Sequence, residues 1–359
     1  MPPTHTRAEK GVKEPMAAAE NNGAHPLLIE VQDLQTYFFL HEGTVKAVDK
    51  VSFDIREGRS LGVIGESGCG KSVTAQSLMR IVPNPPGREV GGTVTLHLQQ
   101  GGGQEELINV LELPAGGSKM RSIRGKQIGM IFQEPMTSFS PLHTIGDQIT
   151  ESVLIHEAGV TKQQARERAI EMLSRVGIPR PQRLVDAYPH QLSGGMRQRA
   201  MIAMALVCGP RLLIGDEPTT ALDVTIEAQI LDLIKDVQAE FGMALMYISH
   251  DLAVVGEMAD EIMVMYLGMV MEHAETDEIF DNPLHPYTLA LWRSIPTIEG
   301  KLERLRPISG TLPSPYAIIP GCPFFARCER RQPGACDVAL PPLREVTPGH
   351  KVRCILYGN

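Results

Sequence analysis

Apolar and polar residues alternate along the first part of the chain, as they do in half-buried strands. The alternation covers "LLIEVQDLQTYFF" (residues 27–39) and "VKAVDKVSFDI" (residues 45–55). The apolar run "SLGVIG" (residues 60–65) then predicts a short buried strand that enters a glycine-rich turn. Residues 98–118 are rich in Gln and Gly, which predicts a loosened hairpin or a loop insertion.

Further along, the apolar spacing changes to the period of an α-helix. Thr161 and Gln164 form a capping-box pattern at the start of one such helix, and Gly177 ends it. Four segments are predicted helices: residues 71–82, 161–178, 196–206 and 223–241. In the second and fourth helices the residues predicted to face inward are Ala165, Ala169, Met172, Leu173, Val176, Ile226, Ile230, Leu233, Ile234 and Val237.

Strands that alternate with helices predict an α/β fold with a mainly parallel sheet covered by helices. "RLLIGDEP" and "MALMYIS" are two further predicted buried strands. Regularity ends near residue 295, and ten prolines follow from Pro296 to Pro348. We expect a disordered arm (residues 1–26), a large domain (residues 27–295) and an irregular C-terminal region (residues 296–359). A helical subdomain lies within the large domain, at about residues 135–205.

Charge and hydropathy narrow the class of protein. The net charge of −8 argues against a general affinity for nucleic acid. Apolar runs such as "IMVMYLGMVM" have ten residues, whereas a membrane-spanning helix needs about 18. The N-terminus lacks the basic and then apolar pattern of a secretory signal. We therefore expect a cytoplasmic protein.

The segment "GESGCGKS" fits the phosphate-binding pattern G-x-x-x-x-G-K-[ST], with a predicted strand before it and a helix after it. Its glycines let backbone N–H groups surround phosphates, Lys71 reaches the β- and γ-phosphates, and the Ser72 hydroxyl ligates Mg²⁺. The alternative is a chance glycine-rich turn, which this context disfavours. The predicted ATP-binding residues of this loop are Gly65, Glu66, Ser67, Gly68, Cys69, Gly70, Lys71, Ser72 and Val73.

Two carboxylates follow the apolar run of "LLIGDEP". Asp216 ends the predicted strand, where its carboxylate can hold the Mg²⁺ shell, and Glu217 can polarise an attacking water. The alternative is a solvated acidic pair at a strand end. The phosphate loop makes the catalytic interpretation the better one.

The segment "LSGGMRQR" places Ser193, Gly194 and Gly195 directly before a predicted helix. A helix N-terminus with a hydroxyl group and no bulky side chain can bind a second anion. Two phosphate-binding ends in one chain suggest two chains that meet head to tail. The ordinary alternative is a simple helix cap.

Together these segments resemble the ATP-binding subunits of the ABC transporter family, in the family's order along about 190 residues. The resemblance implies a P-loop NTPase fold of ABC type with an antiparallel β edge and a helical subdomain. It implies that Gln133 of "MIFQEP" contacts Mg²⁺ and water, and that His250 of "MYISHDL" binds the γ-phosphate and holds Glu217. Asp223 would connect the two sites of a dimer, and Met196 stands where many members have Gln.

The aromatic side chain that stacks on adenine should lie in "LQTYFFL". Spacing from the phosphate loop favours Phe38, with Tyr37 as the alternate. Phe39 is the third candidate. The alternative is that these rings only pack a strand.

Several stretches are similar to one branch of the family, the oligopeptide/dipeptide importers. They include "IGMIFQEPMTSFSP", "DEPTTALDVTIEAQIL" and "NPLHPYTLALWRSIP", the last outside the segment that ATPase chemistry requires. Met196 makes the chain resemble the D-type ATPase subunit. The resemblance implies a second homologous ATPase, two transmembrane permease subunits and an extracytoplasmic binding protein, with this chain on the cytoplasmic face of the membrane. Peptides are the expected substrate, and nickel or oligosaccharides are the alternatives.

The C-terminal region is rich in cysteine. Its four cysteines, separated by five, seven and seventeen residues, suit tetrahedral Zn²⁺ or a [4Fe–4S] cluster, and a cytoplasmic setting disfavours disulfides. The resemblance favours the cluster, as a clasp that holds the tail against a neighbouring subunit. Cys69 and Cys208 are not candidates. The expected metal ligands are Cys322, Cys328, Cys336 and Cys354.

Two other classes of protein compete with the transporter interpretation. Non-transport ABC ATPases carry two ATP domains per chain, coiled coils or basic modules, and none of these is evident here. An electron-transfer or metal-sensing protein would place its function in the cysteine tail. The complete ATPase motif set makes that a secondary role.

Overall fold

The computed structural model describes residues 25–99, 105–134, 138–219, 223–294 and 308–358. The predicted disordered arm lies outside these residues except for its last two positions. So do the first residues of the predicted helical subdomain and of the C-terminal region.

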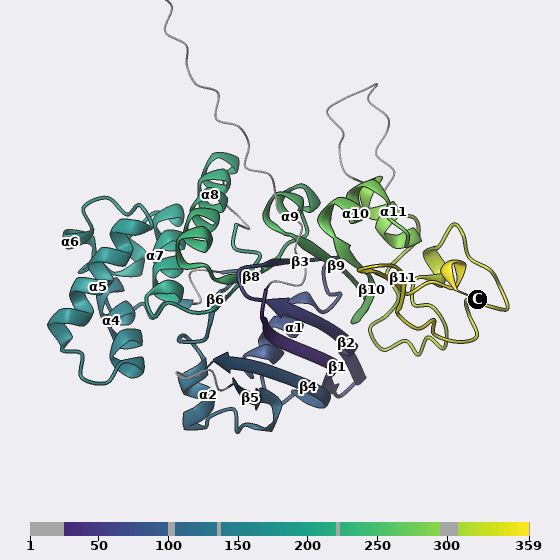
Figure 1. Cartoon of the computed structure of the whole chain (residues 1–359), viewed down its shortest axis with the longest axis horizontal. Helices are drawn as coiled ribbons and strands as arrows, with labels where there is room; N and C mark the ends of the chain where they lie inside the picture. The colour runs from purple at the N-terminus through teal and green to yellow at the C-terminus, as the bar shows by residue number, and fades with distance from the viewer. Residues whose placement is uncertain (1–24, 100–104, 135–137, 220–222, 295–307, 359) are drawn as a thin grey trace, which may run out of the picture.

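The centre of the molecule is an eight-stranded sheet in the order β11-β12-β10-β9-β3-β8-β7-β6 (Figure 1). Strands β9, β3, β8, β7 and β6 are parallel, and β10 to β12 continue the sheet in antiparallel pairs. The parallel core and the antiparallel edge were both predicted. The strands are β3 (Ser60–Ile64), β6 (Ile128–Ile131), β7 (Leu212–Asp216), β8 (Ala244–Ile248), β9 (Glu261–Tyr266), β10 (Met269–Glu275), β11 (Arg344–Thr347) and β12 (His350–Val352).

A separate four-stranded antiparallel sheet lies below the central sheet in the view of Figure 1, in the order β2-β1-β4-β5. The ladder between β4 and β5 accounts for the predicted hairpin in residues 98–118, of which 100–104 lie outside the described residues. These strands are β1 (Leu27–Leu40), β2 (Gly43–Arg56), β4 (Gly87–Gln99) and β5 (Glu105–Asn109).

Helices cover the central sheet on both faces and form a group at one end of it (Figure 1). The capping box of Thr161 and Gln164 is confirmed. The first predicted helix ends early, at Leu78, because Arg80 has a φ of 55°, outside the helical region. The helices are α1 (Lys71–Leu78), α2 (Ser118–Ile123), α4 (Ile145–His156), α5 (Lys162–Arg175), α6 (Pro181–Leu184), α7 (Gly194–Leu206), α8 (Val224–Phe241), α9 (Leu252–Met258), α10 (Thr276–Asp281) and α11 (Pro286–Trp292).

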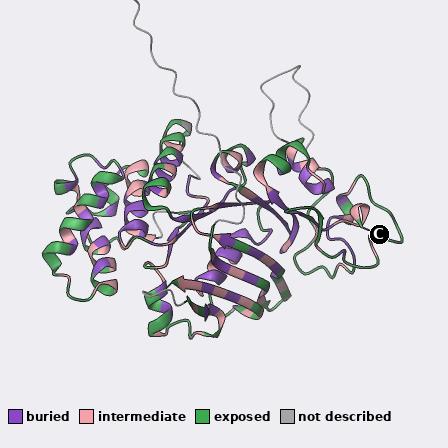
Figure 2. Cartoon of the chain, in the orientation of Figure 1, coloured by how far each residue is buried: buried purple, intermediate pink, exposed green. Residues whose placement is uncertain are grey.

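Two hydrophobic cores flank the central sheet, since successive strand residues point to opposite faces. On β7, Leu213 belongs to the core beneath α7, α8 and α9, whereas Leu212 and Ile214 belong to the core shared with α1 and the antiparallel sheet. Figure 2 shows the central strands buried and the outer helix faces exposed. All the predicted inward residues of α5 and its cap are buried, but Ile226 of α8 is only half-buried.

The cysteine-rich tail is less irregular than predicted, because it contributes β11 and β12 to the edge of the central sheet. The fully buried Glu272 of β10 anchors this edge: its carboxylate accepts hydrogen bonds from Leu284 N (2.6 Å) and His285 N (2.9 Å) and contacts His350 Nε2 at 2.8 Å. Phe324 packs edge-on against Tyr266, with ring centroids 5.4 Å apart. The tail therefore packs on the chain's own ATPase core rather than only on a neighbouring subunit.

Within the described part of the chain, no helix is long and apolar enough to cross a membrane.

Candidate nucleotide-binding site

The predicted phosphate loop connects β3 to α1, so its backbone N–H groups lie at a helix N-terminus that favours anions. Lys71 is 4% exposed and its Nζ donates to the carbonyl oxygen of Gly65 at 2.7 Å. Ser67 and Gly68 are exposed at the tip, and Cys69 is buried beneath them. Burial raises the pKa of the Cys69 thiol, so this group is an inert packing element.

The two side chains predicted to bind magnesium join α1 to the end of β7. Ser72 Oγ donates to Asp216 Oδ1 at 2.8 Å, although the two residues are 144 positions apart. Burial raises the pKa of Asp216, and a bound cation would favour its ionised form. The hydroxyl and the carboxylate therefore lie together where a Mg²⁺ ion could share both.

Two predicted catalytic side chains, Gln133 and His250, converge on the carboxylate of the third, Glu217. Glu217 Oε2 accepts from Gln133 Nε2 at 3.2 Å and lies 3.2 Å from His250 Nδ1. The backbone of Glu217 has a φ of 47°, which is rare for a residue with a side chain, and its N–H donates to Ile248 O at 2.9 Å. This bond to β8 helps to hold a strained backbone in place, as strained residues at active sites require.

The predicted signature segment starts α7. Ser193 is the N-cap and its Oγ accepts from Met196 N at 3.3 Å, while Ser193 and Gly194 remain exposed. A Cβ added to Gly195 would lie 3.1 Å from a methyl group of Ile226 on α8, so this glycine permits the close packing of the two helices. Asp223 is exposed directly before α8 and follows residues 220–222, which lie outside the described part of the chain.

The three candidate aromatics lie at the end of β1 in different surroundings. Tyr37 is fixed by a hydrogen bond from its hydroxyl to Asp49 (2.8 Å), and burial raises its pKa to about 12. Phe38 is half-buried and pairs with Val45 and Gly87. Phe39 is exposed, with the Arg88 guanidinium 5.5 Å from its ring centroid. Phe38 stays the predicted adenine-stacking residue.

Three side chains that touch the site were not predicted. Tyr287 OH accepts from the phosphate-loop N–H of Glu66 at 2.9 Å, and Arg327 forms an ion pair with the Glu66 carboxylate at 2.6 Å. Gln198 is buried and its side chain donates to the carbonyl of Pro218, next to Glu217. Tyr287 belongs to "NPLHPYTLALWRSIP", the segment outside the ATPase motifs, and its hydroxyl nevertheless contacts the backbone of the phosphate loop.

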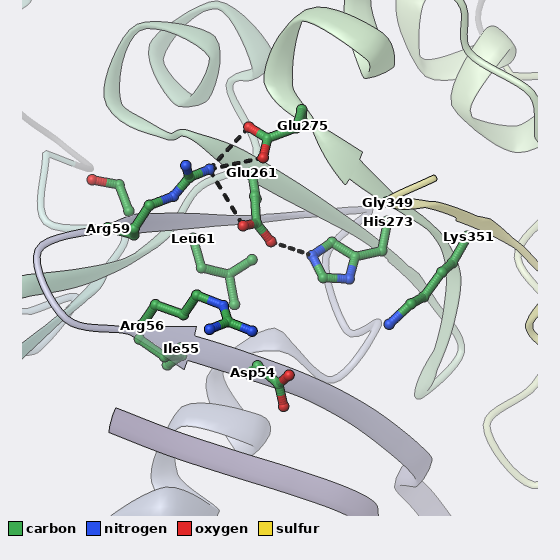
Figure 3. A pocket seen from close by; sticks show the side chains of 11 residues that line it. Asp54, Ile55, Arg56, Arg59, Leu61, Glu261, His273, Glu275, Gly349 and Lys351 are labelled. Atoms are coloured by element: carbon green, nitrogen blue, oxygen red, sulfur yellow. Dashed lines mark hydrogen bonds and ion pairs between the residues drawn. The ribbon is translucent and has the colours of Figure 1, made fainter. Parts of the chain in front are cut away.

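A separate cavity of about 200 Å³ lies at the amino ends of β3 and β9, away from all of these residues (Figure 3). Two of its basic side chains face carboxylates: Arg59 contacts Glu261 at 3.3 Å and Glu275 at 2.9 Å, and His273 lies 3.2 Å from Glu261. Because the Arg59 guanidinium already pairs with two carboxylates, we assign no ligand to the cavity.

The four tail cysteines line one small cavity, together with His285 and Arg330. All four are free thiols, and burial raises the pKa of Cys322 to about 11. Within the described residues, no group of three or more His, Cys, Asp or Glu side chains is arranged to hold a metal ion. The predicted zinc or iron–sulfur site therefore has only the common cavity in its favour.

Comparison with known proteins agrees with this geometry. The ABC transporter family matches residues 48–220, and the family described as "Oligopeptide/dipeptide transporter, C-terminal region" matches residues 271–336. The dimeric structure of MJ0796, a bacterial ABC transporter cassette, superposes with a TM-score of 0.59 at 25% identity and covers 69% of this chain and 99% of that one.

Relatives match along nearly the whole chain. The probable peptide ABC transporter ATP-binding protein y4tR of Sinorhizobium fredii is 47% identical, over 93% of this chain and 96% of the relative. The oligopeptide transport ATP-binding protein AppD of Bacillus subtilis is 46% identical, over 92% and 97%. The dipeptide transport ATP-binding protein DppD of the same organism is 44% identical, over 92% and 95%. The chain therefore belongs to the ABC transporter ATP-binding proteins, in the branch with the oligopeptide/dipeptide transporter C-terminal region, and is an ATPase of that family.

Proposed function

We propose that this chain hydrolyses ATP to power the import of peptides through a membrane transporter. The assignment of ATP hydrolysis rests on the convergence of Gln133 and His250 on Glu217, next to the contact between Ser72 and Asp216. The assignment of peptide import rests on similarity to peptide transport proteins over more than nine-tenths of the chain, tail included.

Phosphoryl transfer depends mainly on the positioning of the reacting groups and on the neutralisation of the phosphate charges. ATP would place its phosphates on the loop N–H groups and Lys71, with Mg²⁺ shared by Ser72 and Asp216. Glu217 would then orient a water for in-line attack on the γ-phosphate and accept its proton. Gln133 and His250 hold that carboxylate at a fixed place, which is what a single general base needs for efficient transfer.

The exposed Ser193 and Gly194 at the start of α7 would complete the site of a partner chain. Two ATPase subunits would close head to tail on two ATP molecules, with Asp223 at the contact between the sites. We propose that the partner is a second, homologous ATPase. This ATPase pair would bind two permease subunits from the cytoplasmic side, and an extracytoplasmic binding protein would supply the peptide.

Co-purification tests the transport assignment. We expect the tagged chain to bring down two membrane proteins and a second ATPase, and we expect its ATP turnover in liposomes to rise when the peptide-loaded binding protein is added. A membrane-free homodimer with full activity would contradict the assignment. Stimulation by nickel or an oligosaccharide with its own binding protein, rather than by peptide, would keep the ATPase role and change the substrate.

For the tail, we propose that the four cysteines hold a [4Fe–4S] cluster. Their side chains line one cavity, and four thiolates are the usual ligands of such clusters. Tetrahedral Zn²⁺ held by the same four sulfurs is the alternative. When bound, the cluster would supply a reducible iron centre and would hold the four cysteine-bearing segments of the tail together.

Anaerobic purification tests this proposal. We expect brown protein that absorbs near 400 nm and contains about four iron atoms per chain. Cys354→Ser should lose most of the iron, whereas Cys208→Ser, outside the tail, should keep it. Colourless protein with one zinc per chain would show that the cluster assignment is wrong.

A further inference from the structure

We infer that Arg327 of the cysteine-rich tail is a positioning residue for the phosphate loop, and that it keeps the Glu66 carboxylate paired so that the loop can accept the triphosphate. The inference rests on the proposed ATP binding but not on any metal in the tail. It makes ATP affinity depend on the attachment of a segment that lies far from the ATPase motifs in the sequence.

The contact joins residues 261 positions apart. Arg327 Nη1 lies 2.6 Å from one oxygen of Glu66, and Nη2 lies 3.0 Å from the other. Two parallel bonds between a guanidinium and a carboxylate form the geometry that fixes both groups in orientation. The Arg327 side chain is 5% exposed and that of Glu66 is 29% exposed, so solvent screens this pair less than a surface pair.

Both partners are held by further groups. Arg327 Nη1 also donates to Tyr266 OH at 3.3 Å, and its Nε donates to Ser309 O at 3.2 Å. On the other side, the Glu66 backbone N–H donates to Tyr287 OH at 2.9 Å. The loop residue is thus fixed at its main chain by the ATPase domain and at its side chain by the tail.

The reason for such a pairing is electrostatic. Glu66 directly follows Gly65 in the loop that must receive several negative charges on the phosphates, and like charges at this range repel. The Arg327 guanidinium neutralises the Glu66 carboxylate, so that this negative charge does not meet the phosphates unpaired. Without Arg327, Glu66 would oppose the incoming triphosphate.

A second observation places the tail beside the phosphate loop. Tail residues 314–321 and the loop residue Gly68 line a common cavity of about 350 Å³, together with Thr44 and Lys46 of β2. Arg327 also directly precedes Cys328, one of the four clustered cysteines. Detachment of the cysteine cluster would therefore withdraw Arg327 from Glu66.

Calorimetric titration of the full-length chain with ATP tests the inference. We expect Arg327→Met to weaken ATP binding by about tenfold, because it leaves the carboxylate unpaired. Arg327→Lys should lie in between, since it keeps the charge but not the two-pronged geometry. Arg293→Met is the matched control: Arg293 pairs with Glu329 at the exposed surface, and its loss should leave the affinity unchanged.

The double variant separates the charge argument from a merely structural role. Glu66→Gln combined with Arg327→Met should restore affinity to within about threefold of the parent chain, because the repelling carboxylate is gone. A double variant as weak as Arg327→Met, or an Arg327→Met variant with parental affinity, would overturn the inference. If the parent chain itself bound no ATP, the proposed function would fail instead.

Discussion

Glu217→Gln should abolish ATP hydrolysis while ATP still binds. The carboxylate is the only one that Gln133 and His250 both contact among the described residues, so it is the group placed to take the proton of the attacking water. An amide of the same shape keeps those contacts but cannot act as a base. We expect turnover to fall by about 10²- to 10⁴-fold, the range that a general base contributes.

Two measurements check this expectation together. Phosphate release should fall to background, and the ATP-bound chains should accumulate as a closed dimer in gel filtration because the step that opens them is blocked. Glu240→Gln is the control, since Glu240 makes a surface ion pair with Arg175. Undiminished phosphate release by Glu217→Gln would rule out Glu217 as the base.

Gly70→Ala should lower ATP affinity by about 100-fold or more, for a steric reason. The backbone of Gly70 has a φ of 104°, a conformation that costs an L-residue about 1–2 kcal/mol. A Cβ at this position would also overlap the carbonyl oxygen of Ala47 on β2, which is backbone and cannot rotate away. The loop must shift, and the backbone strain together with about 1–3 kcal/mol of overpacking amounts to about 3 kcal/mol, which corresponds to about 100-fold in affinity.

Gly68→Ala provides the matched comparison. Gly68 also has a positive φ, of 78°, but a Cβ there meets no atom within 4 Å. It should therefore show a smaller loss, due to backbone strain alone. Calorimetric titration with ATP measures both affinities. Equal values for the two variants would show that the contact with β2 does not set the loop geometry.

Much of the fold follows from local patterns. Alternation predicted β1 and β2, continuous apolar runs predicted β3, β7 and β8, and helical spacing predicted α5, α7 and α8, because burial dictates which positions are apolar. The helix that follows the phosphate loop was predicted to be too long. The turn at Arg80 depends on packing between α1 and the antiparallel sheet, and the spacing of apolar residues does not indicate it. Strands β11 and β12 were missed because they have only four and three residues and β11 is exposed throughout.

The sequence by itself determined the chemistry of the nucleotide site. Phosphate binding, metal ligation and water activation need particular side chains at fixed short spacings, so Lys71, Ser72, Asp216 and Glu217 could be named from "GESGCGKS" and "GDEP". Contacts made by side chains that belong to none of these motifs were decided only by the tertiary structure. The pairing of Arg327 with Glu66 and the bond from the Glu66 N–H to Tyr287 are such contacts, since nothing local to an arginine or a tyrosine indicates which distant backbone the folded chain will bring to it.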